Sequence, residues 1–185
     1  MAGKSTEEVY IGVDGIVSVG TGAAAAPTTA ESALGTGWVD LGYVSDQGVD
    51  ETINQSSTPL RAWQNRKIVR TLVEESDVQY HFVLLQSSAD VVAFYYGGTV
   101  GDDGSIVIDP SVERPHVKFN LDVIDGDERI RAYAPDAQVT EVGSQVYRNG
   151  EPIGYEVTVT CTHDDALGGS VKKWYSALVE EVPAG

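Results

Sequence analysis

Apolar and polar residues alternate with a period of two along much of the second half of this chain. Residues 117–123 follow the pattern, and the hairpin signal Asp125-Gly126 comes directly after them. Residues 153–161 repeat it after a second hairpin signal, Asn149-Gly150. Such alternation gives each strand one apolar face, which is typical of antiparallel sheets with one buried side. The pattern therefore predicts a mainly β protein.

The chain length favours a single domain. With 185 residues, 42% of them hydrophobic and 22% charged, the composition is that of a globular protein rather than a disordered one. This length suffices for one domain with a core and is short for two. We therefore expect residues 1–185 to form one domain, with the fold of an antiparallel β-sandwich or flattened barrel and one packed α-helix.

One helix is expected over Ser88–Tyr96. Ser87 and Asp90 have the spacing of a capping box, and Gly97-Gly98 supplies a stop. Further segments with strand patterns or strand-forming residues are Val9–Val19, Trp38–Val44, Gly48–Gln55, Ile68–Glu74, Val78–Gln86, Glu128–Tyr133, Ala137–Tyr147 and Val171–Val179.

Three segments are expected to lie outside the packed body. Residues 1–8 are polar and predict a flexible N-terminal arm. Residues 20–37 are rich in small residues without apolar periodicity, which predicts a long variable loop, mobile unless something covers it. Gly48–Gln55 carries polar residues on both faces and cannot form a core face. We therefore expect a projecting hairpin at about residues 45–67 that serves as a contact arm.

Charge and cysteine content limit the possible functions. The net charge of −16 is spread along the chain and repels phosphate, which argues against specific nucleic-acid binding. The single cysteine, Cys161, excludes an intrachain disulfide and is expected to be a small core residue. No apolar run is long enough to cross a bilayer, and the N-terminus lacks an apolar signal core. Synthesis and assembly in the cytoplasm are expected.

No motif indicates catalysis. The nucleophile elbow GxSxG, the zinc motif HExxH and the glycine-rich phosphate loops are absent. His163-Asp164-Asp165 is expected to be a turn rather than a metal site. Asp102-Asp103-Gly104 and Asp125-Gly126-Asp127-Glu128 fit tight turns better than a calcium loop, with weak calcium binding as the alternative. We expect no enzyme activity, catalytic residue, metal or cofactor.

A basic and aromatic cluster lies at residues 63–70. It could bind nucleic acid, pair with carboxylates of a neighbouring subunit, or be a solvated strand end. Its position beside the polar ribbon favours the subunit contact, because tryptophan and arginine dominate interface energetics. The candidate interface residues are Asp46, Asp50, Thr52, Asn54, Trp63, Arg66, Lys67 and Arg70.

The order of these features resembles a known family. The most specific pieces are Leu41-Gly42-Tyr43-Val44-Ser45 with Gly48, and Ala62-Trp63-Gln64-Asn65-Arg66, within the segment Gly37–Ser76. Over most of the chain their order and spacing are similar to those of the major tail tube proteins of long non-contractile-tailed bacteriophages (siphophages), especially those of actinobacterial hosts. The resemblance transfers no catalytic residues, because that family has none.

The resemblance implies a structural function. Members of the family assemble as hexameric rings stacked into a tube that conducts genomic DNA to the host without binding it specifically. The projecting hairpin and the N-terminal arm would bridge the rings. Implied partners are further copies of the chain, the tape measure protein, the tail terminator and distal tail or baseplate proteins. The implied location is the virion tail, assembled in the host bacterial cytoplasm, without membrane insertion.

A second function remains open from the sequence. A carbohydrate-binding or adhesin-like β-sandwich would present exposed aromatic side chains as a sugar platform. The candidates for that platform are Tyr95, Tyr96, Tyr133 and Trp174.

Overall fold

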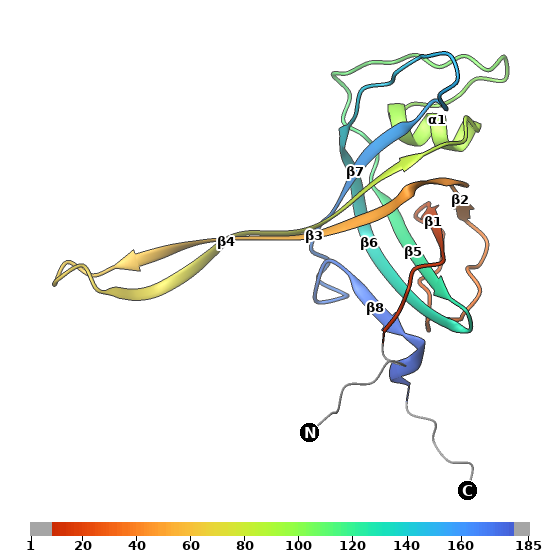
Figure 1. The fold of residues 1–185 in the computed structure, drawn as a ribbon. Coiled ribbons are helices and arrows are strands. Elements are labelled where there is room, and N and C mark those ends of the chain that lie inside the picture. Colours follow the sequence, from red (N-terminus) through yellow and green to blue (C-terminus); the bar gives the residue numbers. More distant parts are fainter. Residues whose placement is uncertain (1–8, 180–185) are drawn as a thin grey trace, which may run out of the picture.

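A computed structural model describes residues 9–179 of the chain (Figure 1). The predicted N-terminal arm, residues 1–8, lies outside the described residues. The elements are β1 (Asp14–Gly20), β2 (Trp38–Asp40), β3 (Val44–Arg61), β4 (Ile68–Leu84), α1 (Ala89–Tyr96), β5 (Val117–Asp125), β6 (Glu128–Val142), β7 (Tyr155–Cys161), β8 (Lys172–Tyr175) and the 3-10 turn η1 (Ser176–Leu178).

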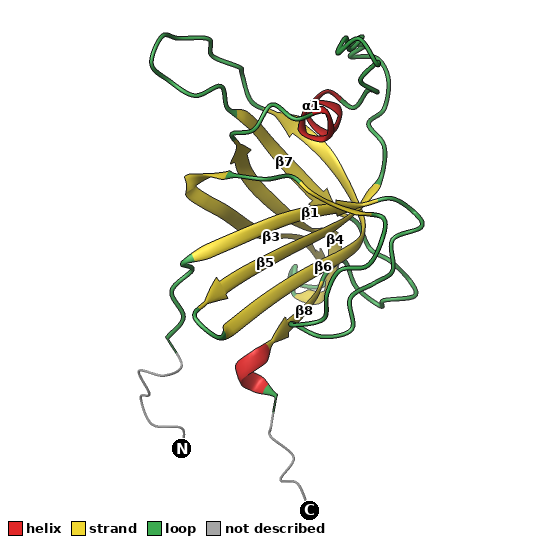
Figure 2. Ribbon diagram, turned by 90° about the vertical axis from the view of Figure 1, so that its right-hand side faces the viewer, coloured by secondary structure: helices red, strands yellow, loops and turns green. Residues whose placement is uncertain are grey.

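The strands form one antiparallel sheet in the order β2-β1-β5-β6-β7-β4-β3, with β8 paired to β6. The first and last strands of this order, β2 and β3, are consecutive in the chain, so the sheet curls until its two ends approach each other (Figure 2). No ladder joins β1 to β3 among the described strands, and the curled sheet stays open there. The predicted mainly β, antiparallel fold with one packed helix is confirmed, as one unclosed sheet rather than two separate ones.

Aromatic residues fill the inner side of the curled sheet. The ring of Phe119 stacks on Tyr80, with 4.9 Å between ring centroids, and Phe82 lies 6.1 Å from it. Tyr80, Phe82 and Leu84, which alternate along the predicted strand Val78–Gln86, are at most 1% exposed. Cys161 is fully buried, and burial raises the pKa of its thiol to about 12. The expectation of a core cysteine is confirmed.

The loop between β1 and β2 covers the opposite face of β5 and β6. Arg131 and Asp122 are register partners there, only 1% and 3% exposed, and the guanidinium donates from Nε and Nη2 to both carboxylate oxygens at 2.6 and 2.8 Å. Arg131 Nη1 also donates to the backbone oxygens of Thr29 and Ser32. Lys118 Nζ donates to the oxygen of Ala24. Residues 20–37 are thus held against the sheet, because buried cations need these carbonyl acceptors.

The helix α1 begins at Ala89, one residue later than predicted. Ser88, not Ser87, is the N-cap, and its hydroxyl accepts from the backbone N–H of Val91. Ser87 instead accepts a hydrogen bond from the hydroxyl of Tyr155. The helix ends at Gly97, whose φ of 75° lies in the left-handed region that glycine favours. It packs at one end of the sheet against β6 and β7 (Figure 2).

One strand, β6, contains the predicted strand Glu128–Tyr133 and the first part of the predicted strand Ala137–Tyr147, and it ends at Val142, before the predicted end. The sequence between them contains Pro135, which has no N–H to donate to a ladder. The β5–β6 register shifts at this point, and the irregularity leaves the proline without a ladder partner. The strand therefore passes through the proline and changes partners, from β5 to β7.

Candidate assembly interface

The hairpin of β3 and β4 extends far beyond the rest of the sheet (Figure 1). β4 pairs with β7 only over Val78–Leu84. Beyond Val78 the two strands pair only with each other, from Asn54–Asp77 out to Arg61–Ile68. We call residues 54–77 the arm. Its eight β3 residues reach roughly 25 Å at the usual rise of a strand.

The arm lies further along the chain than the sequence suggested. Part of the segment 45–67 belongs to the body, because the β3 residues up to Ile53 pair with the part of β4 that β7 holds. A register irregularity within β3 lies between Val44 and Val49, where Gly48 has a φ of 75°. Conversely, the predicted strand Ile68–Glu74 lies on the arm and not in the body.

The arm exposes large apolar side chains. An isolated two-stranded ribbon is only marginally stable in water. A group of several exposed apolar side chains is typical of a surface that another molecule covers. The exposed fractions are Leu60 51%, Trp63 96%, Ile68 56%, Val69 62%, Leu72 41% and Val73 56%.

Local contacts hold the arm extended. Asn54 Nδ2 donates to Asp77 Oδ1 at 2.8 Å, and the Thr58 hydroxyl donates to Glu74 at 2.9 Å. At its root, Lys173 of β8 donates to Glu51 at 2.6 Å. The root is therefore fixed to the body, and the arm has a defined direction.

The tip of the arm is a basic turn. Ala62 N donates to Lys67 O at 2.8 Å, and Asn65 and Arg66 adopt φ angles of 56° and 52° to complete the turn. Residues 61–70 contain four of the 12 lysines and arginines of the chain and none of its 28 acidic residues. A cationic, tryptophan-bearing tip thus stands out from a chain of net charge −16.

The predicted interface residues fall into three groups. Trp63, Arg66, Lys67 and Arg70 come together at or near the tip. Asn54 lies at the arm's base, where it bonds Asp77. The remaining three, Asp46, Asp50 and Thr52, lie on the body part of β3.

Asp50 belongs to a small polar cluster on the body. Its carboxylate is 4.0 Å from His81 Nδ1, and His81 Nε2 lies 2.9 Å from Glu156. This cluster crosses three neighbouring strands, β3, β4 and β7. The sequence grouped Asp50 with the basic residues as an interface candidate, and the structure places it on the body, away from the tip.

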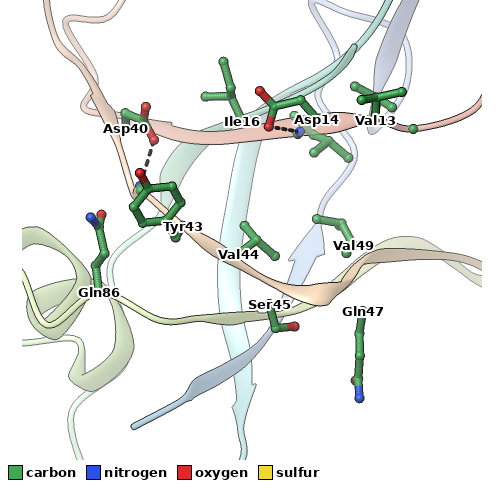
Figure 3. A pocket seen from close by; sticks show the side chains of 16 residues that line it. Val13, Asp14, Ile16, Asp40, Tyr43, Val44, Ser45, Gln47, Val49 and Gln86 are labelled. Carbon is green, nitrogen blue, oxygen red and sulfur yellow. Dashed lines mark hydrogen bonds between the residues drawn. The ribbon is translucent and has the colours of Figure 1, made fainter. Parts of the chain in front are cut away.

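Sequence reasoning missed a groove at the opening of the sheet. It has a volume of about 830 Å³, is flanked by β1 and β3, and has Leu121 and Val123 of β5 among its lining residues (Figure 3). β1 pairs with β2 only over Ser18–Gly20, so among residues 9–179 the remaining edge of β1 has no partner strand and faces the groove. No sequence pattern reveals it, because the groove exists only where the sheet fails to close.

Two aspartates that the sequence offered as metal ligands, Asp103 and Asp164, take part in turns. Among residues 9–179, no three His, Cys, Asp or Glu side chains are placed to hold a metal ion. Asp164 Oδ1 accepts from Leu167 N, and Asp103 Oδ1 accepts from Ser105 N, as expected for turns. Within the same range, no helix has the length and hydropathy that crossing a membrane requires.

His116, Asp136 and Thr162 do form a contact, but not a nucleophile–base pair. His116 Nδ1 lies 2.7 Å from one carboxylate oxygen of Asp136, and the Thr162 hydroxyl donates to the other. The hydroxyl is thus bonded to the carboxylate and not to the imidazole. Burial alone would raise the pKa of Asp136, but these hydrogen bonds outweigh it and lower the pKa below its usual range.

The aromatic residues considered for a sugar platform are mostly covered. Tyr95 and Tyr133 are each 5% exposed. The Tyr95 hydroxyl donates to the oxygen of Gly143 at 2.6 Å, and the Tyr133 ring packs against Trp38 and Trp174. These side chains support the fold and do not form an open platform.

Comparison with known proteins gives a consistent picture. A sequence profile described as phage tail tube protein matches residues 1–184. A search of the curated proteins found no match.

Two solved structures share the fold. A chain of the sheath–tube complex of PVC, an extracellular contractile injection system, in its extended state has a TM-score of 0.51 and 11% identity, over 91% of this chain and 93% of that one. A chain from the sheath/tube terminator of that system has a TM-score of 0.51 and 13% identity, over 91% and 99%. Together with the profile match over nearly the whole length, this places the chain in the phage tail tube protein family, as a structural component of the virion tail.

Proposed function

We propose that the chain polymerises as homohexameric rings that stack into the tail tube, and that the tube conducts genomic DNA to the host. The observation that carries the proposal is the arm. It presents Trp63, cations and uncovered apolar side chains away from its own body, where no part of the described chain covers them. Exposed apolar and tryptophan side chains of this kind are typical of a surface that contacts another molecule, and here we propose a second copy of the chain.

The open sheet supports the same proposal. β3 is the end of the strand order, and most of β1 has no partner on one side. Unpaired strand edges promote association with other chains. In a ring of copies, neighbouring subunits cover such edges.

The acidic composition suits a conduit for DNA. A tube built from chains of net charge −16 repels the phosphate backbone, so the duplex passes without adhering. In this proposal the chain acts without catalysis or cofactors. Its partners are further copies, the tape measure protein, the tail terminator and distal tail or baseplate proteins, and assembly takes place in the host bacterial cytoplasm.

Electron microscopy of the purified chain at high concentration tests the proposal, with rings or tubes as the expected result. Trp63→Ala should leave the monomer folded but raise the concentration needed for polymerisation at least about tenfold, as for an interface hot spot. Tyr147→Ala, which removes another exposed aromatic ring, should assemble normally. A wild-type chain that stays monomeric at every concentration and binds glycans would contradict the proposal.

A further inference from the structure

The segment before β1 has an uncovered apolar face. Val9, Ile11 and Val13 are 66%, 68% and 73% exposed, and their spacing of two places them on one side of an extended chain. The backbone N–H of Val13 donates to Ile124 O at 3.1 Å, and that of Ile11 donates to Asp125 Oδ2 at 2.8 Å. The segment is therefore fixed along the end of β5 with its apolar side chains outward.

Carboxylates border this apolar face. Asp14 follows it directly, and Asp125 and Asp127 lie in the adjoining turn between β5 and β6. Within residues 124–130, Arg129 is the only positively charged residue. The surface is thus apolar at its centre and mainly acidic at its edge.

The same face continues into the groove between β1 and β3. Val13 and Asp14 line that groove together with Ile16, Val44 and Val49 (Figure 3). Its volume of about 830 Å³ is in the range of pockets that hold whole small-molecule ligands, so it accommodates an indole side chain. We call residues 9–14, the β5–β6 turn and the groove the acceptor surface.

The acceptor surface is complementary to the arm tip. The tip offers Trp63 and cations, while the acceptor surface offers carboxylates and a groove lined by both apolar and polar residues. The arm projects away from its own body, so its tip does not reach the acceptor surface of the same copy (Figure 1). Two different patches that fit each other between copies make a heterologous contact, which generates rings or stacks.

We propose that the arm tip of one copy docks on the acceptor surface of a second copy, with Trp63 in the groove and the tip cations facing Asp14, Asp125 and Asp127. This inference rests on the proposed function and specifies one contact by which the copies join. The apolar part supplies affinity, and the opposed charges select the correct orientation.

Cysteine cross-linking tests the contact. Cys161 is fully buried, with a thiol pKa raised to about 12, so introduced cysteines react in its place. In the double variant Gln64→Cys/Ile11→Cys, mild oxidation at high protein concentration should give a ladder of covalent oligomers. Each single variant should stop at a dimer. The matched control Gln64→Cys/Val107→Cys, with Val107 86% exposed, should give no ladder.

The outcomes separate this inference from the proposed function. Tubes without a ladder, or with an equal ladder in the control, would overturn the docking contact and leave the tube proposal standing. A ladder of covalent oligomers without rings or tubes would support the docking contact and contradict the proposed assembly into a tube.

A charge exchange gives a second, independent result. Arg66→Glu/Lys67→Glu and Asp14→Lys/Asp127→Lys should each raise the concentration needed for assembly about tenfold or more. Combining all four changes in one chain should restore assembly at least in part, which a folding defect would not do. Failure of the combined variant to assemble, with its fold intact, would contradict the contact.

Discussion

Arg131 carries a full charge beneath the loop 20–37, and its contacts show how the body is stabilised. The guanidinium is satisfied by Asp122 and by backbone oxygens of the loop, including that of Ser32. A buried ion pair is worth little compared with an apolar pair of the same shape, but losing one partner leaves an uncompensated charge.

Arg131→Met should therefore lower the free energy of unfolding by about 3–5 kcal/mol, measured by urea denaturation. Arg148→Met, which removes an exposed arginine paired with Glu151 at 3.8 Å, should change it by less than about 1 kcal/mol. Equal losses of unfolding free energy in the two variants would show that the buried Arg131–Asp122 pair is not the source of the stabilisation. The change also frees the loop, so protease cleavage within residues 20–37 should become faster.

Asp136 gives a prediction for the pH dependence of stability. Because its folded pKa is lowered, its stabilisation is fully present above the unfolded value of about 3.9 and is lost as pH falls through the lower folded pKa. Asp136→Asn should lower the free energy of unfolding by about 1 kcal/mol at pH 7, since the group is partly exposed. The difference from wild type should shrink below about pH 4. A difference that is constant from pH 7 to pH 3 would exclude this origin.

At the scale of elements, the arm differs from the rest of the sheet. Its strands pair only with each other, whereas β5 and β6 have partners on both sides. Backbone amides of residues 54–77 should exchange quickly in the monomer and at least about tenfold more slowly in tubes. Those of β5 and β6 should be protected in both states. Hydrogen exchange with mass spectrometry measures this, and equal protection of the arm in both states would contradict its role as a contact.

The sequence predicted some elements well, for physical reasons that particular residues illustrate. The alternation around Val157 marks a strand with one buried face, and the glycine stop after α1 marks its end. In β5 the alternation marks the apolar inner face around Phe119, while the opposite face, with Asn120 and Asp122, is buried as well. The arm was predicted too early in the chain because Ile68, Val69, Leu72 and Val73 are strand-forming apolar residues, like those of a core strand. Periodicity shows that a strand has two faces, but it does not show whether a partner strand lies beyond it.

The candidate site was predicted only in part, because sequence patterns report local chemistry but not contacts between strands that are distant in the chain. The chemistry of Trp63 and its basic neighbours is local, so the sequence alone singled it out. The groove beside Ile16 depends on how far the curled sheet closes, which involves strands distant in the chain. No short pattern contains that information.

The whole molecule is strongly acidic, and a third of its lysines and arginines, four of 12, lie within residues 61–70 on the arm. This distribution predicts that assembled tubes do not retain DNA, because the tip cations are occupied and the remaining surface repels phosphate. Tubes mixed with duplex DNA at about 50 mM salt, where electrostatic binding is strongest, should sediment without it. Co-sedimentation that disappears in high salt would contradict the proposed passage of DNA without adhesion.

The register of the arm also limits how its length can vary among related chains. Irregularities at Ser56/Ser57 and Leu60/Arg61 set which side chains share a face at the tip. Adding one residue pair to the two strands would turn that face to the opposite side, while adding two pairs would preserve it. The reach of the arm can therefore change in increments of about 7 Å without reorienting the tip. The separation between joined copies should follow the same increments.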